Sequence, residues 1–464
     1  MNISSILDRA AGQWPDAIAV VDHRQSMTYR ELEAAVESLS RAFRSTGIQQ
    51  GDKLAMLFPR GAAEIVACFA AARLGAVVVQ LSPASRPAEI ERLAERLIFD
   101  AFIYGPDQQA FIPPGTREAS RDLSVGTFSI SVCRSAGQMT SRAEREQFSR
   151  LSAAAIGFSS GTTSESKAMV LSHEALLARG RAEVESFSLC DRDSIMVLLS
   201  ITYGFAPPIT AGLLSGATLV IADSGAPDHV IRLLREQSVT VVYGAPLVYR
   251  LLVNEFVGAP EALRRVRLFV STGTRLPDAL LEEFRARTGH EIVNRYGLNE
   301  CGMVSVNLSR DPGKRGSIGR QAGCEIRLAG AGGSSTSEDS GELLVRGPGL
   351  FEGYCSPWRL RDEICEDGWF HTGDLARRDP DGCYWIIGRI KEMINVAGLK
   401  VVPAEIEDLL LSHPDVEEAL VFGAPDHRFG EVAHAQIKLA AGSRADSTDV
   451  LRYVKERAAF YKVP

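Results

Sequence analysis

The sequence predicts an α/β protein with a large first domain and a small second domain. Helical and strand-like segments alternate near the start, where an amphipathic helix after Thr28 precedes the apolar segment Leu54–Phe58, an alanine-rich helical stretch and the apolar segment Ala76–Leu81. The same alternation resumes between residues 217 and 287. Because this pattern is typical of parallel sheets with helices on both faces, its two occurrences predict two αβα layers.

The first helix is predicted by its cap and by its hydrophobic stripe. Thr28 and Glu31 have the spacing of a capping box, in which each side chain satisfies the backbone N–H of the other residue. Gly47 supplies the C-terminal stop. Between them, apolar residues recur on one helical face at Leu32, Val36, Leu39 and Phe43. We therefore expect an amphipathic helix that ends before Gly47.

The second layer is predicted by short apolar segments with helical patterns between them. The expected strands are Ala217–Ala222, Val239–Tyr243 and Arg267–Val270. The expected helices are Val230–Glu236 and Asp278–Arg287. Gly, Ser and Asp dominate residues 329–340, which predicts a surface loop before a β-rich stretch that reaches Arg389. The large domain, residues 1–388, thus ends in a small β-rich subdomain.

The pattern changes again after about Lys391. A helix from Ala404 turns Ile406, Leu409 and Leu410 inward, and a second amphipathic helix is expected at Asp449–Ala459. Strands are expected at Glu418–Phe422 and Val432–Leu439. We therefore expect a small α+β domain over residues 389–464.

The composition excludes several classes of protein. Of the 464 residues, 45% are hydrophobic and 23% are charged, as in an ordinary globular protein. The formal net charge of −7 argues against a nucleic-acid partner, which requires a concentrated positive field. No apolar run approaches the roughly 18 residues of a membrane span, and the N-terminus lacks the pattern of a signal peptide. The eight cysteines contain no C-x-x-C pair, so neither a zinc site nor a disulfide framework is expected. The sequence predicts a cytoplasmic protein without a membrane span. It does not decide the oligomeric state, for which a homodimer is one option.

A loop rich in hydroxyl side chains, Ser159–Lys167, follows an apolar strand-like segment. Small residues allow successive backbone N–H groups to face one anion, hydroxyls donate further hydrogen bonds, and Lys167 supplies positive charge. The loop, which is expected to join two strands, therefore predicts a phosphate cradle. It is no Walker loop, since Ser166 replaces the second glycine and Ala168 replaces the magnesium-binding hydroxyl. A solvated hairpin without a ligand has similar composition, so the loop alone leaves both alternatives open.

Two later segments carry residue types that nucleotide sites use. Asn294–Glu300 sets a glycine beside an aromatic ring and a carboxylate, the parts needed to flank a base and to hold Mg²⁺. Trp369–Asp374 ends in a Gly-Asp pair, and an acidic residue on ribose hydroxyls recurs in nucleotide sites. A buried Tyr with a solvated Glu, and an ordinary turn Asp, are the alternative interpretations.

In their order and spacing these segments resemble the acyl-adenylate-forming superfamily, which includes acyl- and aryl-CoA ligases, amino-acid adenylation domains and firefly-type luciferases. The resemblance extends from the first capping box to the last residue. The matching segments are Ser159–Lys167, Tyr203-Gly204, Ser271–Gly273, Tyr296–Glu300, Gly341–Leu343, Gly353-Tyr354, Gly373-Asp374, Gly388–Glu392, Gly398 and Pro403–Glu407. The resemblance implies a large domain followed by a small mobile one.

The resemblance also implies a site for ATP and Mg²⁺. The implied catalytic residues are Lys167, Thr163 and Glu300, with Glu300 as the metal ligand. The phosphates would lie on Ser159, Ser160, Gly161, Thr162 and Ser164. Adenine would lie by Tyr296, Gly297, Gly273 and Thr274, the α-phosphate by Asn299, and the ribose by Asp374 and Arg389. The substrate pocket would be lined by Tyr203, Gly204, Phe205, Ser271 and Leu298.

The implied reaction has two steps. A carboxylic acid is activated to acyl-AMP with release of pyrophosphate, and the acyl group then passes to a pantetheine thiol of coenzyme A or of an acyl carrier protein. Two half-reactions require two geometries, so Lys391 is implied as a hinge residue and Gly398 as part of the thiol tunnel. The sequence does not separate the two thiols.

Departures from the family pattern keep alternatives open. Residues 202–208 contain no carboxylate to pair with a substrate ammonium, which favours a fatty, aryl or other non-amino acid over an amino acid. The irregular loop residues Ser164, Ser166 and Ala168 motivate a degenerate nucleotide-binding regulator as a second class of protein. Tyr461–Pro464 matches the approach to the family's last motif, and the sequence stops before the adenylation lysine. We expect a truncated C-terminal domain.

Overall fold

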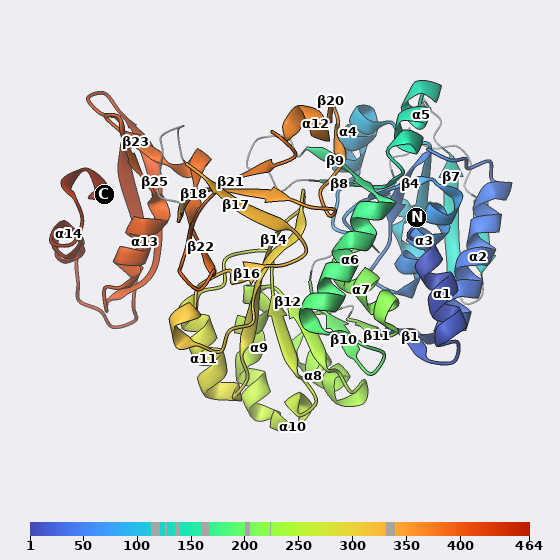
Figure 1. Cartoon of the computed structure of the whole chain (residues 1–464). Coiled ribbons are helices and arrows are strands. Elements are labelled where there is room, and N and C mark those ends of the chain that lie inside the picture. Colours follow the sequence, from blue (N-terminus) through green and yellow to red (C-terminus); the bar gives the residue numbers. More distant parts are fainter. Residues whose placement is uncertain are drawn as a thin grey trace. The chain divides into compact units, whose positions relative to one another are not determined.

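The computed structural model describes residues 1–112, 121–125, 128–134, 139–158, 167–199, 205–222, 224–330 and 339–464. Figure 1 shows the described helices and strands with their labels. They form two compact units. The first unit consists of Met1–Gly316, Gln321–Glu325 and Arg346–Gly368, and the second of Ser317–Arg320, Ile326–Val345 and Trp369–Pro464. The expected boundary between residues 388 and 389 falls inside the second unit and stays a prediction.

The first sheet is built from the early alternation of strands and helices. In spatial order its strands are β20 (Trp358–Leu360), β19 (Gly353–Cys355), β9 (Ala168–Ser172), β8 (Ala153–Phe158), β4 (Val77–Gln80), β3 (Lys53–Leu57), β5 (Ala101–Tyr104), β7 (Phe128–Arg134) and β6 (Arg121–Val125). The central pairs β3–β4, β3–β5 and β4–β8 are parallel. The strands beyond them are antiparallel. Helices along this part of the chain are α2 (Tyr29–Ser45), α3 (Ala62–Leu74), α4 (Pro87–Leu97), α5 (Arg142–Arg150) and α12 (Arg361–Ile364).

The second sheet carries the later alternation. In spatial order its strands are β16 (Arg320–Gln321), β15 (Gly302–Asn307), β14 (Ile292–Leu298), β13 (Leu268–Ser271), β12 (Val241–Gly244), β10 (Ser194–Val197), β11 (Thr218–Ile221), β1 (Ile18–Val21) and β2 (Ser26–Thr28). The strands from β14 to β1 are parallel. At the two ends of this run, β15 pairs antiparallel with β14, and β2 pairs antiparallel with β1. The helices are α1 (Ser5–Gln13), α6 (His173–Phe187), α7 (Pro207–Ser215), α8 (Pro227–Glu236), α9 (Pro246–Gly258), α10 (Pro260–Leu263) and α11 (Asp278–Thr288).

The second unit contains two small antiparallel sheets. One has the order β17 (Glu325–Ala329), β18 (Ser340–Arg346), β21 (Phe370–Arg378) and β22 (Tyr384–Arg389). The other has the order β24 (Leu399–Val401), β23 (Ile394–Val396), β26 (Gly430–Leu439) and β25 (Val416–Asp426). Its helices are α13 (Pro403–Leu411) and α14 (Ser447–Lys455), and their apolar faces join the strands in a core that includes Ile406, Leu410 and Val454.

The α/β fold class predicted from the sequence is confirmed. Parallel strands buried on both faces are nearly all apolar, as in β4 and β12, where every residue is buried. The alternation of segments did not reveal the antiparallel strands that extend each sheet, because those strands pair with partners far away in the sequence. None of the described helices is long and apolar enough to cross a membrane.

The predicted cap of α2 is present, and α6 also begins at a side-chain cap. The Thr28 hydroxyl accepts a hydrogen bond from the Glu31 N–H at 3.2 Å, and the Glu31 carboxylate accepts one from the Thr28 N–H at 2.8 Å. The Ser172 hydroxyl accepts a hydrogen bond from the Ala175 N–H at 3.1 Å, so α6 begins immediately after β9. The residues of the predicted stripe on α2, Leu32, Val36, Leu39 and Phe43, are all fully buried.

Candidate active site

Part of the predicted site falls outside the described residues. These residues are Ser159, Ser160, Gly161, Thr162, Thr163 and Ser164 of the loop, and Tyr203 and Gly204 of the substrate pocket. The flanks of the loop are described. β8 ends at Phe158 and β9 begins at Ala168, and these two residues are antiparallel partners. The prediction that the loop joins two strands is therefore confirmed.

Lys167 and Glu300 both contact one tyrosine, Tyr354, the first at its ring and the second at its hydroxyl. The Lys167 ammonium is 5.0 Å from the centroid of the Tyr354 ring, within the range of a cation–π contact. The Tyr354 hydroxyl donates a hydrogen bond to Oε1 of Glu300 at 3.2 Å. Burial, and then the negative charge of Glu300, raise the pKa of Tyr354, so the hydroxyl stays a donor at neutral pH. The structure thus brings together the predicted phosphate cation and the predicted metal ligand.

The backbone of Glu300 is fixed by two further hydrogen bonds. Its carbonyl oxygen accepts from the Phe351 N–H at 2.8 Å and from Nη2 of Arg179 at 3.0 Å. The Arg179 side chain, which extends from α6 and is buried, also donates from Nε to the Gly349 carbonyl at 2.8 Å. Gly302 leaves room for it, because a Cβ there would lie 2.6 Å from Cγ of Arg179. The turn that carries Glu300 is therefore held against the Gly349–Phe351 segment.

Asn299 connects the same turn to the start of the hydroxyl-rich loop. Its Nδ2 donates a hydrogen bond to the carbonyl oxygen of Phe158 at 3.0 Å, and Phe158 is the last residue of β8. A carboxamide nitrogen carries two hydrogens, so this bond occupies one of them. Asn299 and Glu300 therefore both lie beside the two strands that the loop joins.

The segment predicted to hold adenine is fixed by a buried polar network. Arg295 of β14 donates from Nε to Oε1 of Glu183 at 2.6 Å and from Nη1 to the Thr272 hydroxyl at 3.2 Å. The Tyr243 hydroxyl donates to Oε2 of Glu183 at 3.0 Å. Glu183 is 0% exposed and Arg295 is 8% exposed, so the ion pair lies in the core. The network ties β14 to the turn after β13, which contains Gly273 and Thr274, both exposed.

The strand register changes where the predicted adenine residues lie. β14 pairs Tyr296 with Ser305 but Gly297 with Met303, which is an irregularity of the ladder between the two residues. A Cβ on Gly297 would lie 2.4 Å from the Gly302 carbonyl oxygen, so this close approach of backbone requires glycine. Irregularities of this kind often redirect side chains beside active sites. The structure therefore gives Gly297 a packing reason besides its predicted place near the base.

The three described pocket residues differ in exposure. Phe205 is fully buried, and its ring lies 5.1 Å from the Phe69 ring in an edge-on contact. Ser271 ends β13 and is 1% exposed, and its hydroxyl has no hydrogen-bond partner among the described residues. Leu298 ends β14 and is half-buried. The lining role of these residues stays a prediction.

The predicted ribose residues form a pair inside the second unit. Nε of Arg389 donates to Oδ1 of Asp374 at 2.5 Å, and the two residues are direct partners of β21 and β22. Asp374 is 2% exposed. The preceding residue, Gly373, donates its N–H to Oε1 of Glu342 at 3.0 Å, and Glu342 also pairs with His371 at 2.9 Å. The Gly-Asp pair is thus held in place from the neighbouring strand β18.

The remaining predicted residues of the second unit lie in exposed connections. Lys391 belongs to the short 3₁₀ turn Ile390–Glu392, which follows β22. Gly398 lies in the turn between β23 and β24, and its N–H donates to Oδ1 of Asn395 at 2.9 Å. A turn directly after a strand is a suitable place for a hinge, but the hinge role of Lys391 stays a prediction.

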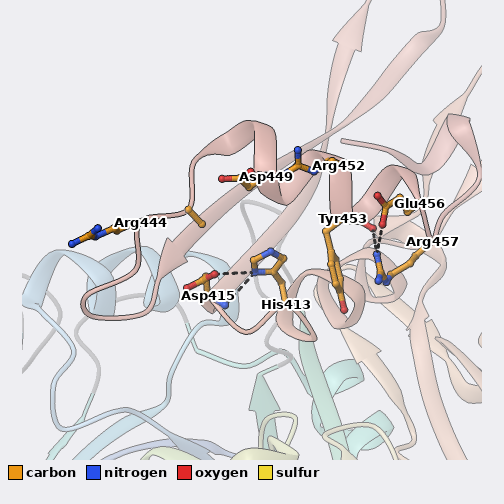
Figure 2. Close-up of a pocket in the computed structure, with 9 residues that line it drawn as sticks. His413, Asp415, Arg444, Asp449, Arg452, Tyr453, Glu456 and Arg457 are labelled. Atoms are coloured by element: carbon orange, nitrogen blue, oxygen red, sulfur yellow. Dashed lines mark hydrogen bonds and ion pairs between the residues drawn. The ribbon is translucent and has the colours of Figure 1, made fainter.

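A surface pocket of about 560 Å³ lies elsewhere in the second unit, and no residue of the predicted site lines it. Figure 2 shows its charged side chains around α14. Arg457 pairs with Glu456 at 3.0 Å and stacks over the Tyr453 ring at 3.8 Å, and Arg452 pairs with Asp449 at 2.5 Å. Because these acids and bases neutralise one another, we do not assign the nucleotide to this pocket.

Sequence analysis missed three residues that organise the site. Tyr354 was quoted within a motif but was given no role, and Arg179 and Glu183 were not recognised. Arg179 and Glu183 are four residues apart on α6 and lie on its buried face. Charged residues on the apolar face of a helix were the available signal, because such residues are almost never buried unless they are paired.

A carboxylate just after a strand of one parallel α/β sheet, beside the two strands that a hydroxyl-rich loop joins, is an arrangement typical of nucleotide-binding enzymes. The chain belongs to the AMP-binding enzyme family, whose model matches residues 7–355. The model of the AMP-binding enzyme C-terminal domain matches residues 405–464. The resemblance to acyl-adenylate-forming enzymes is thereby confirmed.

Known relatives span nearly the whole chain. The chain is 31% identical over 487 residues to the medium-chain fatty-acid–CoA ligase of Escherichia coli (strain K12), covering 100% of this chain and 86% of that protein. It is 28% identical over 477 residues to a feruloyl-CoA synthase of Amycolatopsis sp., covering 98% of this chain and 92% of that protein. The solved structure of ATP-bound MatB from Rhodopseudomonas palustris matches with a TM-score of 0.83 at 24% identity, covering 100% of this chain and 94% of that one. The structural match supports the fold.

Proposed function

We propose that the chain is an acid–thiol ligase that activates a carboxylic acid with ATP and transfers the acyl group to coenzyme A. The observation that carries the proposal is the convergence of Lys167 and Glu300 on Tyr354, beside the strands that the hydroxyl-rich loop joins. Relatives named as CoA ligases or synthases cover nearly the whole chain. Family membership and local geometry therefore support the same chemistry.

The first half-reaction sets the electrostatic requirement. A carboxylate oxygen attacks the α-phosphorus of ATP while both reactants are anionic, so the site has to neutralise charge and align the attack opposite the departing pyrophosphate. Lys167 supplies a cation at the end of the loop. The second amide hydrogen of Asn299 serves the α-phosphate, since the first is used on Phe158. The loop residues Thr162 and Thr163 stay predicted phosphate contacts.

The chemistry of Glu300 fits a magnesium ion. Mg²⁺ in nucleotide sites is typically held by one or two carboxylates together with substrate phosphates and waters, not by an all-protein cage. Among the described residues, no group of three or more His, Cys, Asp or Glu side chains is placed to hold a metal ion. Oε1 of Glu300 accepts the hydrogen bond from Tyr354, and the Glu300 carboxylate is the group that would hold the ion. When bound, Mg²⁺ would neutralise phosphate charge.

The second half-reaction moves the acyl group to sulfur. The thiol sulfur attacks the carbonyl carbon of the acyl-adenylate, and the bond from that carbon to the phosphate oxygen breaks. AMP leaves with that oxygen, and the thiol proton passes to solvent. Asp374 accepts hydrogen bonds from the paired ribose hydroxyls, and Arg389 holds its carboxylate in place. Lys391 as the hinge and Gly398 beside the thiol remain predictions.

The substrate class we propose is a fatty, aryl or other acid without an ammonium group. Residues 202–208 contain no carboxylate that could pair with an amino group. The relatives named above act, by their names, on a medium-chain fatty acid and on ferulate. Coenzyme A is the proposed acceptor of the acyl group, because the same relatives are named as CoA ligases or synthases. A pantetheine carrier protein is the alternative acceptor.

A panel of carboxylic acids with hydroxylamine trapping of the acyl-adenylate tests the proposal. We expect ATP-dependent trapping with at least one fatty or aryl acid, and its loss in Lys167→Ala and in Asp374→Ala. Lys455→Ala, an exposed lysine of α14, is the matched control and should keep activity. Thioester formation is then compared with free CoA and with a phosphopantetheinylated carrier protein. Undiminished activity in both site variants would overturn the site, and no turnover with any acid would favour the nucleotide-binding regulator.

A further inference from the structure

We propose that Tyr354 is a positioning residue that holds the Glu300 carboxylate and the Lys167 ammonium in one arrangement around the phosphates of ATP. The inference rests on the proposed function, in which Glu300 receives the metal–nucleotide complex. It assigns to Tyr354 a role in orienting these two groups and no part in bond making or breaking.

The register of the sheet explains the contact with Lys167. β19 pairs antiparallel with β9, and Tyr354 is the direct partner of Met169. Lys167 lies two residues before Met169, so a continuation of the strand geometry places it diagonally across from Tyr354 on the same face of the sheet. Diagonal neighbours are within reach of aromatic and long side chains. The 5.0 Å between the ammonium and the ring centroid agrees with this placement.

The contact with Glu300 restricts the freedom that its backbone bonds leave. The Glu300 carbonyl is held by Arg179 and by the Phe351 N–H, so the turn itself is fixed without Tyr354. The side-chain torsions of Glu300 are restrained by a different contact, the hydrogen bond from the Tyr354 hydroxyl to Oε1. That bond uses one carboxylate oxygen, Oε1, and does not occupy the other.

The ring of Tyr354 is itself held from the same segment that fixes the Glu300 turn. The Phe351 and Tyr354 rings lie 4.9 Å apart at an interplanar angle of 60°. Phe351 also donates its N–H to the Glu300 carbonyl at 2.8 Å. The segment before β19 therefore positions the backbone of Glu300 and the side chain that orients its carboxylate. Because β19 pairs with β9, the same tyrosine also lies diagonally across from Lys167.

Two variants separate the two contacts. Tyr354→Phe keeps the ring against Lys167 and removes the hydroxyl, whereas Tyr354→Leu removes both. Binding of ATP is measured by calorimetry with Mg²⁺ and with EDTA, and Mn²⁺ binding in the presence of ATP is measured by electron paramagnetic resonance. Thermal unfolding reports whether each variant is folded. Tyr29→Phe is the matched control, because it removes a buried hydroxyl that bonds the carbonyls of Gly212 and Ala217 at 3.2 and 2.7 Å.

The expected pattern differs for each variant. Tyr354→Phe should weaken Mn²⁺ binding and Mg²⁺–ATP binding by roughly tenfold, the usual size for loss of a hydrogen bond to a charged group, and leave metal-free ATP binding within about twofold. Tyr354→Leu should also weaken metal-free ATP binding, because Lys167 loses its ring contact. The Tyr29→Phe control should change the unfolding temperature and neither binding constant.

Glu300→Gln distinguishes failure of this inference from failure of the proposed function. If Glu300→Gln abolishes the effect of metal on ATP binding while Tyr354→Phe binds Mn²⁺ as the wild type does, the positioning role is overturned and the metal site stands. If Glu300→Gln leaves Mn²⁺ binding unchanged, the metal assignment fails and the role of Tyr354 fails with it. Equal weakening by Tyr354→Phe with and without metal would also overturn the inference, since it would indicate a general structural effect.

Discussion

The buried ion pair between Glu183 and Arg295 offers a sharp test of how the nucleotide segment is supported. Glu183→Gln keeps the shape of the side chain and one acceptor oxygen but removes its charge. Arg295 would then remain a cation that is 8% exposed, next to a neutral partner. In the wild type, Nε and Nη2 of Arg295 lie 2.6 and 2.5 Å from Oε1 of Glu183, and the substitution removes the negative charge at this contact.

The magnitude follows from the burial of both groups. Breaking a buried pair by removing one partner costs about 3–5 kcal/mol, because the other charge is left uncompensated. The amide oxygen still accepts one hydrogen bond from Arg295, so we take the lower end, about 3 kcal/mol. At about 2 °C per kcal/mol for a large domain, the unfolding temperature should fall by about 6 °C. The KM for ATP should rise more than the KM for the acid, since Arg295 also holds Thr272 beside Gly273.

Thermal unfolding and pyrophosphate exchange measure the two effects. Glu146→Gln is the matched control, because it also removes one negative charge from a Glu–Arg pair. Glu146 pairs with Arg142 four residues earlier on α5, and both side chains are solvent-exposed. An exposed helix pair contributes about 0.3–0.5 kcal/mol, so the control should shift the unfolding temperature by about 1 °C. A shift in Glu183→Gln no larger than in the control would refute the reasoning that burial makes this pair important.

Three further predictions address stability and binding. Burial raises the pKa of Glu64 from 4.5 to about 8, so the folded chain keeps a proton that the unfolded chain loses. The free energy of unfolding should therefore fall as the pH rises from about 4.5 to 8. Glu64→Gln should flatten this pH dependence, measured by urea unfolding. Parallel pH profiles for the two proteins would count against this. Gly302→Ala places a Cβ 2.6 Å from Cγ of Arg179, on a residue whose φ is 76°. It should lower the free energy of unfolding by about 1–3 kcal/mol. An unchanged free energy of unfolding would show that α6, which carries Arg179, moves aside without cost. Asp374→Asn should raise the KM for ATP about tenfold in pyrophosphate exchange by weakening the charged contact to ribose, and an unchanged KM would remove Asp374 and Arg389 from the nucleotide site.

Local signals in the sequence were sufficient to predict much of the fold. The capping box of Thr28 and Glu31 predicted the start of α2, because a cap depends on residues three or four positions apart. The central parallel strands were also predictable, since their apolar segments are separated by recognisable helices. These features are encoded within one short window of sequence.

Contacts between distant segments could not be predicted in the same way. The pairing of β9 with β19 sets Tyr354 beside Lys167, and nothing near either residue specifies the other strand. Arg179 and Glu183 look like ordinary solvated charges until α6 is packed against the second sheet. Family motifs selected Lys167 and Glu300 as site residues, but the side chains that orient them emerged only from the structure.

Helix α6 shows how one surface organises the predicted nucleotide segment. Arg179 and Glu183 are four residues apart, so their side chains project from the same face of the helix. Arg179 holds the carbonyl of Glu300, whereas Glu183 holds the guanidinium of Arg295. The two contacts fix both ends of the segment 295–300, which contains the predicted adenine residue, the irregular strand register and the predicted metal ligand. Because α6 begins at the cap directly after β9, and β9 follows the hydroxyl-rich loop, a single short strand connects this loop to the helix that anchors the segment.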